Sequence, residues 1–102
     1  MTDVKIIRND ESDLEVAVSG MLDTAAVADF SSNFEPVIKE AHKHVELDFS
    51  GLDYISSSGL RVLLVLAKQA ASSGGSVCIK GMNPDVRQVF CLTGFDKVFA
   101  IV

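Results

Sequence analysis

Three consecutive serines, Ser56–Ser58, are the residues of this chain best placed to do chemistry. Gly59 follows them, and then leucines and alanines recur at helical spacing, so the hydroxyls are expected at a helix N-terminus. Backbone N–H groups there have no intrahelical partner, and the helix dipole favours negative charge. The serines could therefore cap the helix, bind a phosphate group or become phosphorylated, and three hydroxyls are more than one cap requires.

Enzymatic roles for these serines find little support in the surrounding residues. The phosphate-binding patterns GxxxxGKS/T and GxGxxG are absent, and the nearest cation to the loop is Arg61. Ser57 lacks the GxSxG context of a hydrolase nucleophile, and His42 and His44 are expected at the solvated end of a helix. We therefore expect no catalytic residues, no cofactor and no metal site. Nucleotide binding by the loop that contains Ser56–Ser58, called the serine loop below, is kept as an alternative.

Composition argues against several classes of function. The 102 residues carry a net charge of −5 and no run of Lys or Arg, which argues against binding to nucleic acid. The N-terminus is too polar for a signal peptide, and no apolar run is long enough for insertion into a membrane. Cys78 and Cys91 are isolated in the sequence, so we expect two reduced, largely buried thiols in a cytoplasmic protein.

Apolar periodicity places the serine loop within an α/β chain. Two strands joined by a short polar turn are followed by helices and strands in alternation. The expected strands cover residues 4–7, 14–20, 45–49, 76–80 and 98–102. The expected helices cover about 25–41, about 56–72 and 84–93.

Pro36 makes the first of these helices irregular. A proline there removes the hydrogen bond to the carbonyl of Ser32, and weak helix formers come just before it. We expect a bend or a break near residues 32–36, with an irregular loop and a short second helix as the alternative. At the start of this helix, Asp23 or Thr24 can supply the N-cap.

The order of the elements, β-β-α-β-α-β-α-β, defines the expected fold class. A hairpin followed by alternating helices and strands implies right-handed crossovers. The prediction is an α/β fold, with a mixed, mostly parallel sheet of four to five strands and helices packed against it. No linker or internal repeat divides the chain, so residues 1–102 are expected to form a single domain.

Two segments of the chain have a recognisable pattern, GMLD at residues 20–23 and LDFSGLDYISSSGL at residues 47–60. With them the chain resembles the STAS domain family, and more narrowly its stand-alone bacterial anti-sigma factor antagonists. The resemblance covers essentially the whole chain in length and element order. It implies a STAS fold and a regulatory protein rather than an enzyme.

The resemblance also implies a mechanism of partner switching. Antagonists of this family bind an anti-sigma factor that is also a serine kinase of the histidine-kinase-like ATPase fold, and this binding releases the sigma factor. The kinase then phosphorylates a serine at the start of the helix after the third strand, and a metal-dependent serine phosphatase reverses the reaction. Ser57 takes the acceptor position, with Ser56 and Ser58 as alternates, and Ser56 stands where the family usually has Asp.

A docking surface around the serines is expected on the same grounds. Phosphate on Ser57 would add about −1.5 to −2 charges, and Arg61, one helical turn further on, could pair with it. The expected partner-binding residues are Asp23, Thr24, Tyr54, Ser56, Ser57, Ser58, Gly59 and Arg61. The alternative is a non-catalytic STAS docking subunit of another assembly, such as a lipid-transport ABC complex or a signalling scaffold.

Overall fold

Buried apolar side chains at every second position of the central strands give the sheet one face on which a core can form. The computed structural model describes residues 2–102, and in it Leu14, Val16 and Val18 alternate with half-exposed residues along one central strand. The elements are β1 (Thr2–Asn9), β2 (Asp13–Leu22), η1 (Thr24–Ala26), α1 (Val27–Lys39), β3 (His44–Ile55), α2 (Ser57–Ser73), β4 (Ser76–Lys80), α3 (Pro84–Thr93), η2 (Phe95–Lys97) and β5 (Ala100–Ile101).

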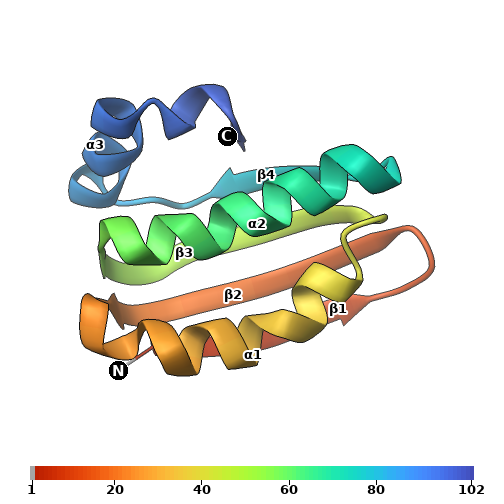
Figure 1. Cartoon of the computed structure of the whole chain (residues 1–102), viewed down its shortest axis with the longest axis horizontal. Coiled ribbons are helices and arrows are strands. Elements are labelled where there is room, and N and C mark those ends of the chain that lie inside the picture. The colour runs from red at the N-terminus through yellow and green to blue at the C-terminus, as the bar shows by residue number, and fades with distance from the viewer. Residues whose placement is uncertain (1) are drawn as a thin grey trace.

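The five strands lie in the sheet in chain order. β1 pairs antiparallel with β2, and β3, β4 and β5 continue the sheet in parallel. α1 and α2 lie side by side across one face of the sheet (Figure 1). α3 packs at the end of β3, where the rings of Phe90 and Phe49 meet edge to face with centroids 6.4 Å apart. The predicted fold, a mixed and mostly parallel sheet with packed helices, is confirmed.

β3 is longer than the sequence pattern predicted, and it ends at Ile55 rather than at Phe49. Its pairing with β2 shifts register twice, and each shift places one extra residue on β3. The extra residues interrupt the alternation of buried and exposed side chains after Phe49, which is why the pattern ended there. Because β4 reaches only to the pair Asp48–Lys80, the last part of β3 has no strand on that side.

α1 runs without a break through Pro36, so the predicted break is wrong. A proline inside a helix costs about 3 kcal/mol. Phe30, Phe34 and Val37 are completely buried on the inner side of α1, and the first two rings stack with centroids 4.8 Å apart. Burying each such side chain contributes about 1.5–3 kcal/mol, so packing outweighs the lost hydrogen bond.

Two further expectations need correction. Both cysteines are free, but Cys91 lies exposed on the outer side of α3 and Cys78 is only half-buried, so they are not largely buried thiols. The last strand is reduced to Ala100–Ile101, because residues 95–97 form a 3-10 turn. None of the helices within residues 2–102 is long and apolar enough to cross a membrane.

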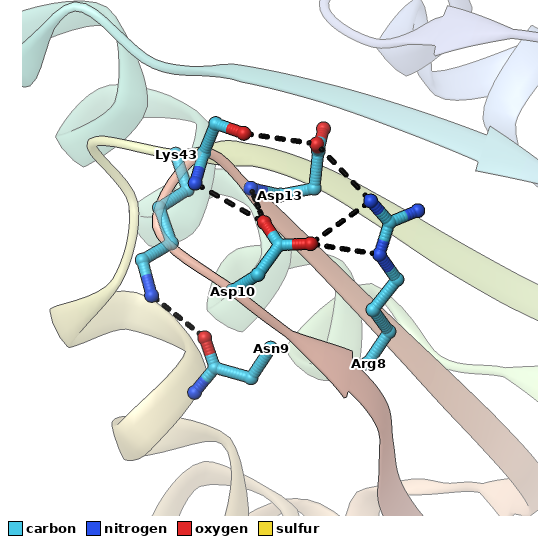
Figure 2. A network of polar contacts seen from close by, with 6 residues as sticks. Arg8, Asn9, Asp10, Asp13 and Lys43 are labelled. Carbon is cyan, nitrogen blue, oxygen red and sulfur yellow. Dashed lines mark hydrogen bonds and ion pairs between the residues drawn. The ribbon is translucent and has the colours of Figure 1, made fainter.

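A polar network at the β1–β2 turn fixes the edge of the sheet opposite the serine loop (Figure 2). The carboxylate of Asp10 accepts hydrogen bonds from the Asp13 N–H at 2.8 Å and from Arg8 Nε at 2.9 Å. These bonds hold the pKa of Asp10 below its ordinary value. Lys43, from the loop after α1, donates to Asn9 Oδ1 at 2.6 Å and so ties the hairpin to the start of β3.

Substitution of Gly75 tests how tightly the loop after α2 packs against the loop after α1. A Cβ on Gly75 would overlap the carbonyl oxygen of Ala41 and lie 2.6 Å from that of Lys43. Because backbone atoms cannot move aside cheaply, Gly75→Ala should lower the free energy of unfolding by about 3 kcal/mol or more in urea denaturation. Gly74→Ala is the matched control, since it meets open space and adds only the strain of φ 80°, about 1–2 kcal/mol. Equal losses for the two variants would contradict this packing.

Acid should lower the stability of the β1–β2 hairpin because it protonates the carboxylate of Asp10. Its pKa is lower in the folded chain than its ordinary value of 3.8, so its contribution to stability is present above pH 4 and is lost as the pH falls through the folded pKa. Asp10→Asn should therefore make the urea midpoint fall less steeply between about pH 5 and pH 2. Glu11→Gln removes a carboxyl outside the network and serves as the control. A variant of Asp10 with an unchanged pH slope would show that the network does not stabilise the fold.

Candidate functional site

The carboxyl ends of β2 and β3 bring the serine loop against the turn that contains Asp23. The backbone N–H of Ser56 donates to the carbonyl of Leu22 at 2.8 Å. Gly59 lies so close to β2 that an added Cβ would be 2.7 Å from the Leu22 side chain. A larger residue at this position would therefore force α2 away from the end of β2. In Figure 1 the first turns of α1 and α2 lie at the same end of the molecule.

The three serines differ in burial and therefore in what they can do. Ser56 is the N-cap of α2, because its Oγ accepts a hydrogen bond from the Gly59 N–H at 3.2 Å. The residue is only 7% exposed, so its hydroxyl has a structural role at the start of α2. Ser57 begins the helix and is exposed, and Ser58 is half-buried. Ser57 is therefore the most accessible of the three hydroxyls.

Several residues near Ser57 in the fold are exposed or half-exposed. Tyr54 is paired in register with Met21 of β2, and each is 45% exposed. Thr24 is exposed in η1, and Arg61 is exposed one helical turn after Ser57. We define the docking face as the following residues: Met21, Asp23, Thr24, Tyr54, Ser57, Ser58 and Arg61.

Asp23 has a structural role in the docking face. Its Oδ1 accepts a hydrogen bond from the Ala26 N–H at 2.9 Å, which caps η1 at the start of the first helical segment. The sequence left the cap open between Asp23 and Thr24, and the structure assigns it to Asp23. The bond stabilises the turn that follows Leu22, whose carbonyl accepts the hydrogen bond from the Ser56 N–H of the other loop.

The residues that the sequence predicted for partner binding lie in the turn before α1, at the end of β3 and in the first turns of α2, and their burial divides them into two groups. Ser56 and Gly59 are buried and support the surface from beneath. The others are exposed or half-buried and contribute to the docking face. Met21 was missed, because its position beside Tyr54 depends on the register shifts of β3, and these leave no clear pattern in the sequence.

A small-molecule or metal site is not apparent at this edge of the sheet. Within residues 2–102 no three His, Cys, Asp or Glu side chains are grouped to hold a metal ion. A hollow of about 510 Å³ lies between the start of β1 and α1, and Asp3, Asp23 and Asp29 line it. Carboxylates so placed would repel the phosphates of a nucleotide in this hollow, which none of the three serines lines.

Relatives of known sequence share most of the chain. The family model described as "Mlab, STAS domain" matches residues 7–102. BtrV of Bordetella bronchiseptica, a proposed anti-sigma factor antagonist, is 33% identical over 88 residues, which are 86% of this chain and 76% of that protein. A STAS-domain containing protein of Pseudomonas aeruginosa is 27% identical over 92 residues, 90% of each chain.

Solved structures show the same fold. An anti-sigma factor antagonist from Mycobacterium paratuberculosis superposes with a TM-score of 0.83 at 20% identity, over 99% of this chain and 85% of that one. The antagonist SpoIIAA in its unphosphorylated form gives a TM-score of 0.78 at 18% identity, over 98% and 88% of the two chains. At such identities the likeness establishes the fold alone. Sequence match and fold agree, and we conclude that this chain belongs to the STAS domain family, among relatives named as anti-sigma factor antagonists.

Proposed function

We propose that this chain is a cytoplasmic anti-sigma factor antagonist that binds an anti-sigma factor through the docking face and thereby releases a sigma factor. The observation that carries the proposal is the division of roles among the serines. Ser56 supplies the helix cap from a buried position, so the hydroxyl of Ser57 is left exposed at the first position of α2. The family to which the chain belongs contains proteins named for this activity.

Reversible phosphorylation of Ser57 is the proposed switch. The partner is an anti-sigma factor that is also a serine kinase of the histidine-kinase-like ATPase fold, and a serine phosphatase restores the hydroxyl. A phosphate at the N-terminus of α2 meets the positive end of the helix dipole, so the fold should tolerate it. The same phosphate would put charge and bulk where the partner contacts a small neutral group. The complex should therefore separate while the antagonist stays folded.

Ser56 affects the rate of this switch. Both Ser and Asp are good N-cap residues, so a serine here keeps the cap and removes a carboxylate next to the acceptor. A carboxylate beside Ser57 could orient its hydroxyl during phosphate transfer. We therefore expect transfer to wild-type Ser57 to be slower than transfer to the Ser56→Asp variant.

A permanent docking subunit of another assembly is the second candidate function. The observation in its favour is the same serine at position 56, since a docking surface that is never phosphorylated needs no carboxylate there. A stable complex that forms with a non-kinase partner, and that is indifferent to the charge at residue 57, would favour this candidate.

Incubation with a purified serine kinase of the stated class and ATP, followed by peptide mass spectrometry, tests the acceptor. Ser57→Ala should abolish phosphorylation. Ser56→Ala should keep it, while losing about 1 kcal/mol of stability because the Gly59 N–H loses its cap. Phosphate found on Ser56, or outside residues 56–58, would overturn the assignment to Ser57.

A fixed charge at position 57 should break the complex without unfolding the chain. Ser57→Asp should weaken binding to that kinase by about 2 kcal/mol, roughly thirtyfold, since it buries an unpaired charge at the interface. Isothermal titration calorimetry measures the affinity, and circular dichroism should show unchanged secondary structure. Ser32→Asp, which adds the same charge at an exposed position of α1, is the control. Equal affinities for the two variants would place the interface elsewhere.

A further inference from the structure

A shallow apolar groove borders the docking face on the side of α3. Tyr54 and Ile55 line it from the end of β3, and Val86 and Val89 line it from α3. Its volume is about 250 Å³, which is less than a typical small-molecule pocket of about 300–1,000 Å³. A hollow of this size suits one or two side chains from another protein better than a ligand.

One side chain fixes the distance between the two walls of the groove. Asn83 accepts a hydrogen bond from the Val86 N–H at 2.8 Å and so caps α3. Its Nδ2 donates to the carbonyl of Leu52 at 3.0 Å, in the part of β3 that extends past β4. The groove is therefore formed before a partner arrives, and binding in it would not have to order a loop.

Two exposed carboxylates flank the apolar floor, one from each wall. Asp53 belongs to β3 and Asp85 to the first turn of α3, and both line the groove. The ion pairs found within residues 2–102 are made by other carboxylates. These two charges are thus available to a partner, and complementary charge beside an apolar anchor is typical of specific interfaces.

We propose that this groove binds a basic segment of a protein partner, in which an apolar side chain enters between β3 and α3 while flanking Lys or Arg residues pair with Asp53 and Asp85. The inference rests on the proposed function, because Tyr54 belongs both to the docking face and to the groove and the same partner would cover both. A second copy of this chain is a poor occupant, since each copy carries a net charge of −5.

Titration of isotope-labelled protein with three short peptides, followed by amide chemical shifts, tests the groove without any kinase. The probes are KKLFKK, its acidic counterpart EELFEE and the apolar-deleted KKSSKK. Millimolar KKLFKK should shift the amides of Tyr54, Ile55, Val86 and Val89. It should bind at least about fivefold more tightly than either other peptide, because each exposed charge pair contributes modestly and the leucine and phenylalanine supply the anchor.

Matched variants distinguish the effect of the two carboxylates that flank the groove from the effect of the net charge of the protein. The double variant Asp53→Asn, Asp85→Asn should weaken KKLFKK binding by about fivefold. The double variant Glu11→Gln, Glu35→Gln removes the same total charge at exposed positions in the hairpin turn and on α1, and should leave the affinity unchanged. Val89→Gln should weaken binding by removing part of the apolar wall, with the dispersion of the amide spectrum as the check on folding.

Several results would overturn the proposal. They are equal binding of KKLFKK and EELFEE, shifts confined to residues outside the groove, no binding at millimolar peptide, and shifts of the groove amides that depend on protein concentration alone. The last result would indicate self-association instead. Because no step uses phosphorylation, this test can fail while Ser57 is still the acceptor, and it can succeed while Ser57 is not.

Discussion

The contact between the start of α2 and the end of β2 is the constraint on which the proposed docking face depends. The Ser56 N–H reaches the Leu22 carbonyl, and Gly59 leaves no space between helix and strand. The first is a backbone hydrogen bond, and the second is a close approach of Gly59 to the side chains of Leu22 and Ile55. Together they hold the first turn of α2 against the end of β2.

That arrangement lets adjacent residues with the same side chain serve different purposes. A helix N-terminus offers unpaired N–H groups, and one buried hydroxyl satisfies one of them. The cap requires Ser56 to point into the chain, and the next residue begins the helix with its side chain outside. The exposed position of Ser57 is thus a geometric result of the cap, and it does not need a separate stabilising interaction.

Much of this fold can be predicted from periodicity, and the errors share a physical cause. The strand–helix order, the Asn83 cap and the location of the serine loop follow from local patterns, which local hydrogen bonds and burial enforce. Pro36 and Cys91 were misjudged because tertiary packing decides them: the aromatic stack of Phe30 and Phe34 holds α1 together, and α3 turns Cys91 outward. Met21 could not be predicted, because its place beside Tyr54 arises from register shifts between strands. The groove beside α3 could not be predicted either, because it depends on how α3 packs against the end of β3.

β3 carries two extra residues relative to β2, so the pairing of its second half depends on the number of residues in this segment more than on their types. Two register shifts place Tyr54 opposite Met21, so removing one residue between Phe49 and Ile55 would change either a bulge or the pairing of Tyr54 with β2. The same loss would shorten the span from the sheet to the helix by one residue step of about 3.3 Å. Substitutions on the outer side of this segment leave the pairing of the strands in place, whereas a single insertion or deletion would shift the residues after it by one position against β2.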